Sequence, residues 1–367
     1  MLNKFINYDN NFIYERGNVE SMYQSIEYKD IKSNYLIVDV RSPLEYKEST
    51  INGAINIPIF DDDERCEIGT VYVNESKEKA KKIGVKYASN KLPFIYEEML
   101  KYKNQYEKIV LFCARGGMRS TIISGFLNSM GLNVIKLEGG YKSYRNYVIN
   151  ELITLNENKN YIVLHGNTGV GKTEILKNLK NKGYSILDLE GAANHRGSML
   201  GHVGLGNTNN QKQFESNIFH QLQESKDDYI FIEAESSRIG SANVPKYILN
   251  KMKEGFHIYV DAPLEFRVNL IVDEYMKAEN AKNEIIECLT KFSKYISKED
   301  IELYRELLMK DEFAKVTKEL MVKYYDPLYM KSAKRYLFEL KIFSQNIEEA
   351  VSMIEKEYLN RWHKVEA

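Results

Sequence analysis

Two loops in the sequence combine reactive side chains with glycines, and each follows an apolar run. The first is Cys113–Ser120 (CARGGMRS), which comes directly after KIVLF and opens a helical pattern. A thiol between a strand end and a helix start lies among backbone N–H groups that favour negative charge. Arg115 and Arg119 add to that positive field. We therefore predict that Cys113 is a nucleophilic thiolate or a persulfide carrier, rather than an inert buried cysteine.

The second loop, Gly166–Thr173 (GNTGVGKT), fits the phosphate-binding pattern G-x-x-x-x-G-K-[ST]. An apolar run precedes it and a helical pattern follows, as the motif requires. Glycines let backbone N–H groups approach phosphate oxygens, Lys172 neutralises charge, and the Thr173 hydroxyl is a ligand for Mg²⁺, which stays a candidate ion. The loop is predicted to hold a diphosphate, either of a nucleotide or of another pyrophosphate ester. The predicted phosphate-binding residues are Gly166, Gly169, Gly171, Lys172 and Thr173.

Two polar clusters follow later apolar runs, where ligands of parallel α/β folds gather. One spans Asp188–Ser198 and the other Glu233–Gly240; a solvated loop and a charged helix cap are the alternatives. Glu233 stands where a nucleotide-hydrolysing enzyme of this type would carry an Asp, so ATP or GTP hydrolysis stays open. The candidate acid/base or ligand residues are Glu190, His195, Arg196, Glu233, Glu235 and Arg238.

The elements that position these loops alternate between strand and helix patterns, which predicts an α/β fold. A polar, Asn-rich stretch at 147–160 separates two such units, so we expect domains at 1–150 and 155–265, and a helical region at 266–367. The predicted strands are Tyr35–Val40, Lys108–Phe112, Asn133–Leu137, Tyr161–Leu164, Ser185–Leu187, Tyr229–Ile232 and His257–Val260, with a helix at Ser120–Met130.

Composition is that of a globular protein, with 43% hydrophobic and 28% charged residues among 367. No apolar run approaches the ~20 residues that span a bilayer, and Met1–Asn10 lacks the apolar core of a signal peptide. We therefore expect a cytoplasmic location and no membrane partner. The net charge of −1 neither supports nor excludes a nucleic-acid partner.

Cysteine is scarce, with three widely spaced residues. This count argues against a disulfide framework and a structural zinc site. We predict no metal site and no tightly bound cofactor. Cys66 is expected in an acidic loop and Cys288 in a helix, both without a chemical role.

Residues 36–58 (LIVDVRSPLEYKESTINGAINIP) and 137–144 (LEGGYKSY) resemble the rhodanese domain, which implies that fold for residues 1–150. The residues that match its signature are Asp39, Arg41, Glu45, Gly53, Ala54, Asn56 and Pro58. Five residues separate Cys113 from Arg119, the spacing of Cys-x5-Arg phosphatases, so a phosphatase is one alternative.

Nearly the whole chain resembles the bacterial tRNA 2-selenouridine synthase family. In addition to the rhodanese segments and the phosphate loop, the resemblance is carried by residues 189–198 (LEGAANHRGS), 211–216 (QKQFES), 233–240 (EAESSRIG) and 324–329 (YYDPLY). It implies a P-loop domain that follows the rhodanese-like domain.

The resemblance also implies two reactions on the wobble 2-thiouridine of tRNA. A geranyl group from geranyl diphosphate is attached to the sulfur, and selenium from selenophosphate then displaces the S-geranyl group. Cys113 matches the family's essential cysteine, thought to carry selenium as a selenenylsulfide, with Arg115 and Arg119 beside it. The phosphate loop matches the holder of the prenyl diphosphate. The implied partners are tRNA and a supply of selenophosphate from selenophosphate synthetase.

Other functions fit the same residues. A sulfurtransferase coupled to an ATP-dependent, kinase-like P-loop activity would consume ATP without a prenyl donor. A redox- or nucleotide-sensing module would bind ligands without turnover. The helical C-terminal region, rich in Tyr and Lys, either helps to hold tRNA or is an ordinary bundle.

Overall fold

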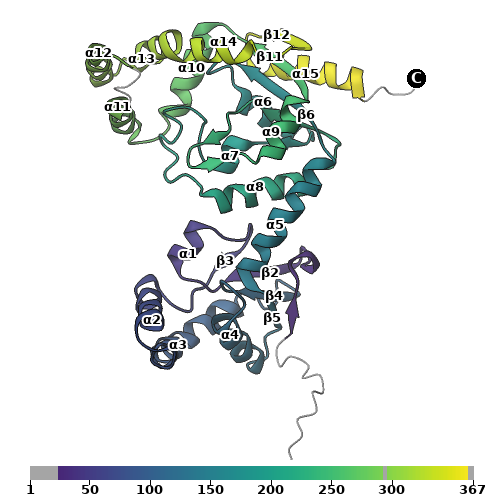
Figure 1. Ribbon diagram of the computed structural model, residues 1–367, viewed down its shortest axis with the longest axis vertical. Coiled ribbons are helices and arrows are strands. Elements are labelled where there is room, and N and C mark those ends of the chain that lie inside the picture. The colour runs from purple at the N-terminus through teal and green to yellow at the C-terminus, as the bar shows by residue number, and fades with distance from the viewer. Residues whose placement is uncertain (1–23, 292–295, 363–367) are drawn as a thin grey trace, which may run out of the picture. The chain divides into compact units, whose positions relative to one another are not determined.

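A computed structural model describes residues 24–291 and 296–362 (Figure 1). The segment Met1–Asn10, expected from its composition to carry no signal sequence, lies outside these residues. By internal contacts the chain forms two compact units, one comprising the residues up to Ser42 together with Ala54–Tyr141, the other Pro43–Gly53 together with the residues from Lys142 onward. The chain therefore passes between the units three times.

The first unit is built on a parallel five-stranded sheet with strand order β1-β5-β4-β2-β3. The strands are β1 (Ser25–Ile26), β2 (Tyr35–Asp39), β3 (Ile55–Asn56), β4 (Lys108–Phe112) and β5 (Val134–Leu137), and a short 3-10 helix spans Tyr28–Asp30. The central strands β2 and β4 are apolar along almost their whole length, as strands covered on both faces must be.

Along the chain, helices α2 (Asp62–Asn74) and α3 (Lys77–Leu100) come between β3 and β4 and pack against each other. Helix α4 (Met118–Ser129) follows β4. Asp61 and Glu64 form a capping box at the start of α2. Cys66 lies on this helix and is exposed, so the predicted acidic loop is wrong. The acidic residues that suggested a loop instead favour the positive end of a helix.

The second unit also contains a parallel five-stranded sheet, with order β12-β11-β6-β8-β7. Helix α5 (Gly140–Glu157) leads directly into β6, so the Asn-rich stretch is largely helical. The strands are β6 (Asn160–Gly166), β7 (Ile186–Leu187), β8 (Tyr229–Glu233), β11 (Phe256–Asp261) and β12 (Leu340–Phe343), beside a separate antiparallel pair, β9 (Arg238–Ile239) and β10 (Ala242–Asn243). The helices packed around the strands are α6 (Lys172–Asn181), α7 (Leu189–Ala193), α8 (Gln211–Glu224), α9 (Lys246–Lys253) and α15 (Ile347–Trp362).

Side chains of β6 and β11 alternate between the two faces of this sheet. One set joins the core formed with α6 and α15: Ile162, Leu164, Ile258 and Val260. The other set lines a pocket together with residues of α9 and of a later helix, α14 (Asp326–Ala333): Val163, His165, His257 and Tyr259.

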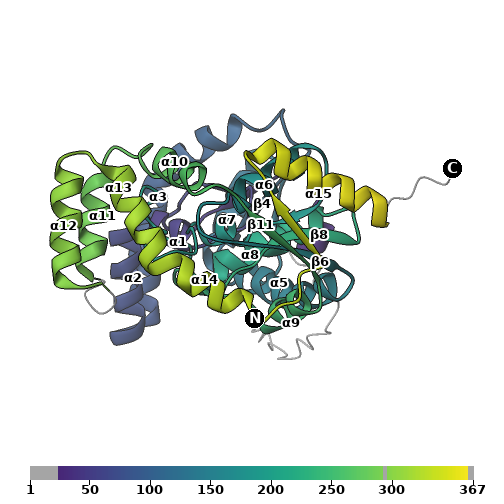
Figure 2. The ribbon, with the colours of Figure 1, turned by 90° about the horizontal axis from the view of Figure 1, so that it is seen from above.

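Between β11 and β12 the chain forms a helical subdomain with its own core, which includes Tyr275, Leu289, Tyr304 and Leu308. Figure 2 shows its helices α11, α12 and α13 side by side. The helices are α10 (Leu264–Tyr275), α11 (Ala281–Lys291), α12 (Lys298–Met309), α13 (Phe313–Leu320) and α14, with a π-helical turn at Met321–Tyr325.

The C-terminal region is helical as predicted, but the chain returns from it to the P-loop sheet. Strand β12 pairs with β11 at the sheet edge, and α15 covers the adjoining core. A four-residue strand among Lys and Glu residues gives too short a pattern to stand out from helix. None of the helices in the described part of the chain has the length and apolarity needed to cross a membrane.

Residues 43–53, which include helix α1 (Pro43–Glu48), pack with the second unit although they lie inside the rhodanese-like segment. The Thr50 backbone N–H donates to the Gln213 side chain at 2.9 Å. The Gln213 amide donates to Asn52 Oδ1 at 3.0 Å, and Asn210 donates to the Glu48 carbonyl at 2.9 Å. These contacts tie the start of α8 to this excursion.

Candidate active site

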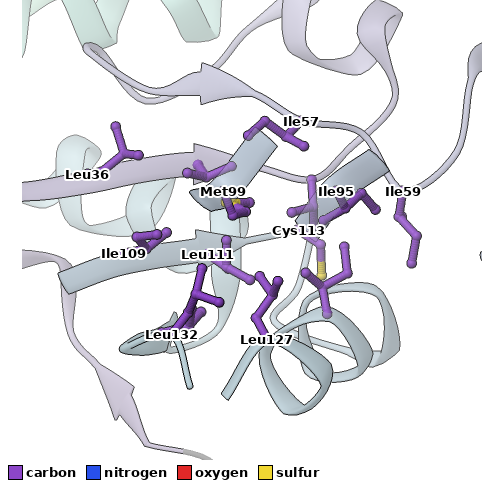
Figure 3. Packing of buried hydrophobic residues seen from close by; sticks show 14 of the residues in the cluster. Leu36, Ile57, Ile59, Ile95, Met99, Ile109, Leu111, Cys113, Leu127 and Leu132 are labelled. Carbon is purple, nitrogen blue, oxygen red and sulfur yellow. The ribbon is translucent and has the colours of Figure 1, made fainter. Parts of the chain in front are cut away.

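Cys113 lies where the sequence predicts, between the end of β4 and the start of α4. Only 3% of the residue is exposed, and Figure 3 shows it beside Ile59, Ile95 and Leu127 at the margin of the first unit's core. Its sulfur lies 3.3 Å from the oxygen of the fully buried Ser120 hydroxyl, which lies 3.2 Å from the Gly117 carbonyl and can donate its one proton to either. Ser120 carried no signal in the sequence beyond its place in the first turn of a helix.

The pKa of the Cys113 thiol lies below its ordinary value. Burial opposes ionisation and is the largest single effect, but the hydrogen bonds outweigh it: the Ser120 hydroxyl and the backbone N–H groups of Ser120 and Arg115 donate to the sulfur. The Arg119 charge contributes further in the same direction. Arg115 acts through its backbone, because its own side chain is exposed.

The Gly139-Gly140 turn holds the cysteine loop in place. Gly140 adopts a φ of +60°, and a Cβ there would lie 2.3 Å from the Cys113 carbonyl oxygen and 2.4 Å from the Gly116 nitrogen. The next residue, Tyr141, donates its N–H to that carbonyl at 2.9 Å. Only glycine allows the two backbone segments to approach so closely.

Three residues of the rhodanese signature support the loop instead of lining it. Asp39 and Arg41 form a buried ion pair at 2.6 Å, and the Arg41 guanidinium lies 4.2 Å from the centre of the Tyr141 ring. Asn56 donates to the backbone carbonyls of Asp39 and Arg41 at 2.9 and 3.0 Å. These contacts fasten the carboxyl end of β2 beside that of β4.

In the second unit, the phosphate loop joins β6 to α6 as predicted. Gly169 and Gly171 have φ values of +79° and +82°, and a Cβ on Gly171 would lie 2.2 Å from Ile347 Cδ1. Lys172 bends back over the loop, with Nζ 3.4 Å from the Gly166 carbonyl and 5.3 Å from the centre of the Tyr329 ring. The backbone therefore has the shape that exposes N–H groups to a phosphate.

Three of the predicted carboxylates surround the Thr173 side of this loop. The Thr173 hydroxyl lies 2.9 Å from Glu190 Oε2 and 3.2 Å from Glu233 Oε2, and Glu233 also accepts from the Glu190 N–H at 2.9 Å. The Gly197 backbone comes so near that a Cβ would lie 2.6 Å from Glu235 and 2.7 Å from Glu190. The structure thus brings residues from both polar clusters together.

Crowding and burial keep these carboxyl groups protonated up to an unusually high pH. Burial raises the pKa of Glu190 to about 8, and the negative charge of Glu235 adds to the effect. Burial likewise raises the pKa of Glu233, which is fully inaccessible, well above its ordinary value, and that of Glu235 to a smaller extent. Within the described residues, no group of three or more His, Cys, Asp or Glu has the arrangement of a metal site.

The other predicted residues of the polar clusters are placed differently. His195 is held against Gly201 and Gly240, its Nδ1 is buried without a hydrogen bond among the described residues, and burial lowers its pKa. Arg238 is exposed and donates to the Gly240 carbonyl beside the β9–β10 pair. Arg196 pairs with Glu274 at 2.6 Å.

An open pocket with about 870 Å³ of empty space lies against the phosphate loop. We call it the loop pocket. At one end are Lys172, Thr173 and Glu190. The remaining wall comes largely from the helical subdomain and is mostly apolar, with Leu200, Leu270, Ile271, Leu320, Met321 and Tyr325 among its residues.

The sequence pattern did not single out the contact that joins this wall to the phosphate loop. Arg267 on α10 is buried; it makes a two-pronged ion pair with Asp326 at 2.9 Å and donates to the Thr168 carbonyl at 3.2 Å. Asp326 lies in the YYDPLY segment, whose Tyr325 and Tyr329 both line the loop pocket. The family resemblance pointed to this segment without assigning it a place.

A rhodanese-like domain with Cys113 between a strand and a helix, and a P-loop domain with a pocket at its phosphate loop, thus occur in one chain. Comparison with known sequences agrees. Residues 19–147 match the rhodanese-like domain, and residues 159–361 match the AAA domain of tRNA 2-selenouridine synthase. The chain belongs to the tRNA 2-selenouridine synthase family.

Relatives of that name cover both domains. The protein of Hydrogenovibrio crunogenus is 32% identical over 82% of this chain and 89% of its own length. The protein of Sulfurovum is 28% identical over 93% of this chain and 100% of its own length. The protein of Nitrosomonas eutropha is 34% identical over 66% of this chain and 63% of its own length. Among solved structures, a rhodanese-related protein from Thermoplasma volcanium is 26% identical over 34% of this chain and 93% of its own, with a TM-score of 0.21.

Proposed function

We propose that this protein converts the wobble 2-thiouridine of tRNA to 2-selenouridine in two steps: geranylation of the sulfur by geranyl diphosphate, then replacement of the S-geranyl group by selenium from selenophosphate. The observation that carries the first step is the loop pocket, where a phosphate-binding loop opens onto an apolar wall. A diphosphate with a hydrocarbon tail matches both ends of this pocket.

The phosphate loop supplies what the geranylation step requires. The 2-thiocarbonyl sulfur attacks the first carbon of the geranyl group, a carbon–sulfur bond forms, and the carbon–oxygen bond to diphosphate breaks. Negative charge accumulates on the departing diphosphate, where Lys172 and the loop N–H groups stabilise it. The uridine N3 proton is lost as the ring becomes neutral, and Glu235, when ionised, is the candidate acceptor beside the loop.

The cysteine loop is suited to the selenium step. Alkylation turns the sulfur into a leaving group: the selenium of selenophosphate attacks C2, the C2–S bond breaks and geranylthiol departs, and water cleaves the selenium–phosphorus bond to release phosphate. The donors around Cys113 favour an anionic sulfur, and the Arg119 charge favours an anionic selenium donor such as selenophosphate. Selenophosphate synthetase, or an equivalent source, would supply that donor.

The test is to incubate the protein with 2-thiouridine tRNA, geranyl diphosphate and selenophosphate, digest the RNA and identify the nucleosides by mass. Wild type should give selenouridine. Cys113→Ala should accumulate geranylthiouridine, and Lys172→Ala should give little of either product. Cys66→Ala, at an exposed position on α2, is the matched cysteine control and should behave as wild type.

Two outcomes would replace the proposal. Thiouridine that stays unchanged with folded wild-type protein would exclude it. ATP consumption without any prenyl donor would favour the sulfurtransferase coupled to a kinase-like activity, and the Thr173 hydroxyl beside Glu233 is the feature that would serve Mg²⁺-bound ATP. Repeating each assay with and without Mg²⁺ shows whether the ion is required.

A further inference from the structure

A second pocket lies on the face of the P-loop sheet opposite the core formed with α6 and α15. We call it the histidine pocket. It contains about 890 Å³ of empty space open to solvent and reaches Gly166 and Tyr329, so it meets the phosphate loop near the loop pocket, which Tyr329 also lines. Rings dominate one part of its wall: His165, His257, Tyr259 and Tyr336. The geranylation step does not use these side chains.

The two histidines form a fixed pair at the bottom of this pocket. Both are buried, His165 Nε2 lies 2.9 Å from His257 Nδ1, and His257 Nε2 lies 3.3 Å from the Lys253 carbonyl. Because a carbonyl can only accept, His257 Nε2 carries a proton and its Nδ1 accepts one from His165 Nε2. His165 Nδ1 is then a lone-pair acceptor, and it has no partner in the described part of the chain.

The His165 ring stays neutral across the working pH range. Burial, followed by the charges of His257 and Lys172, lowers its pKa to about 3. A neutral ring with a bare nitrogen can accept a hydrogen bond from an N–H group but cannot offer one at that atom. The Tyr336 ring packs against both histidines, with centroids 4.6 and 4.8 Å away, and is itself half-buried.

Exposed cations surround the residues that enter the pocket from α14 and the turn after it. Ala333 and Tyr336 line the pocket, while Lys331, Lys334 and Arg335 between and beside them are exposed. None of these three makes an ion pair with another described residue. Leu328, which also lines the pocket, is 63% exposed, so the mouth is open. Rings beside unpaired cations are what single-stranded nucleic acid requires: stacking for a base and charge for the backbone.

We propose that the histidine pocket receives the base of the target uridine, turned out of the anticodon loop, with Tyr336 stacking on the ring, His165 Nδ1 accepting from its N3–H, and Lys331, Lys334 and Arg335 contacting the flanking phosphates. This inference rests on the proposed function. It places the acceptor base and the prenyl tail in separate pockets that meet at the phosphate loop. An N3–H is present in uridine and absent in cytidine, so the same contact selects the base.

The first test measures binding of a fluorescent anticodon stem-loop that carries 2-thiouridine. Tyr336→Ala should weaken binding by about 10-fold, and Tyr336→Phe should retain it because the ring remains. The double variant Lys331→Ala/Lys334→Ala should bind more weakly and reduce the slope of log Kd against log salt by about 1.4, or ~0.7 per lost phosphate contact. Lys82→Ala/Lys86→Ala, two exposed lysines on α3, removes the same charge and should leave the slope unchanged.

Turnover with separate substrates completes the test. In Tyr336→Ala the KM for RNA should rise while the KM for geranyl diphosphate stays at the wild-type value. Wild type should prefer 2-thiouridine over 2-thiocytidine at the wobble position, and His165→Leu should lose that preference. The inference would be overturned if Tyr336→Ala bound RNA as tightly as wild type does. It would also be overturned if Tyr336→Ala bound ATP more weakly than wild type does while its affinity for RNA was unchanged. If wild type makes no modified nucleoside, the proposed function fails, and the binding measurements still decide whether the pocket holds a base.

Discussion

Replacing Ser120 by Ala should raise the pKa of the Cys113 thiol, because its hydroxyl is the side-chain donor to the sulfur, at 3.3 Å. The hydroxyl has one proton, which it gives to the Gly117 carbonyl while the sulfur is protonated and can turn to the sulfur once that ionises. A hydrogen bond to a charged group contributes ~1.5–3 kcal/mol, and 1.36 kcal/mol corresponds to one pKa unit. We therefore expect the pKa to rise by about 1–2 units.

The measurement is the pH dependence of iodoacetamide alkylation, with the modified peptide identified by mass. It is made in a Cys66→Ser background, because Cys66 is exposed and would react as well. The midpoint of the rate profile, and not the rate at one pH, reports the pKa, since a more basic thiolate is also a better nucleophile. At a pH below both midpoints, the thiolate fraction should fall by about 10- to 100-fold.

Ser124→Ala is the matched control. Ser124 lies one turn further along α4, is equally buried, and contacts Asn128 instead of the sulfur. Its midpoint should equal that of the parent. A midpoint for Ser120→Ala that does not differ from the Ser124→Ala value would refute the assignment of the hydroxyl as the donor that lowers the pKa. Urea unfolding of both variants checks that any change is not a loss of folding.

Two further predictions concern stability in the second unit. The pKa of Glu190 is about 8 in the folded protein, against 4.5 for an ordinary Glu, so the folded state binds the proton more tightly and the free energy of unfolding should fall as the pH rises from 4.5 through 8. The slope should be at most ~1.4 kcal/mol per pH unit for this proton, and Glu190→Gln should flatten it in urea titrations; a slope unchanged by the substitution would contradict the assignment. Asp326→Ala leaves the Arg267 charge buried without its partner and should cost ~3–5 kcal/mol of unfolding free energy, together with weaker binding of geranyl diphosphate, which calorimetry would detect. Glu265→Ala, which breaks an exposed pair with Lys318, should cost no more than ~1 kcal/mol, and equal losses in the two variants would show that burial is not the cause.

The parts of the fold that the sequence predicts well are those that local pattern determines. The predicted strand Lys108–Phe112 coincides with β4, and each of the two loops lies between a strand and a helix as expected. Glycine spacing identified the phosphate loop because its positive-φ positions are a backbone requirement. Strand β12 was missed because its four residues acquire meaning only by pairing with β11 across the sheet.

The same reasoning explains which site residues could be found. Glu190 follows β7 and Glu233 ends the neighbouring strand β8, so their meeting at Thr173 could be expected from topology. Ser120 could not, because a buried serine on a helix resembles any other. His165 was passed over as the last residue before the phosphate loop, and its pairing with His257 depends on the register of β6 against β11.

The excursion of residues 43–53 limits how this protein can be divided. A gene fragment ending near residue 150 would carry Pro43–Gly53 away from the helix whose Asn210 and Gln213 bond to it. In the fragment that starts after residue 150, the side chains of Asn210 and Gln213 would lack these hydrogen-bond partners. No single break in the chain yields both units intact as their internal contacts define them. A cut near residue 150 would therefore leave part of the second unit attached to the first.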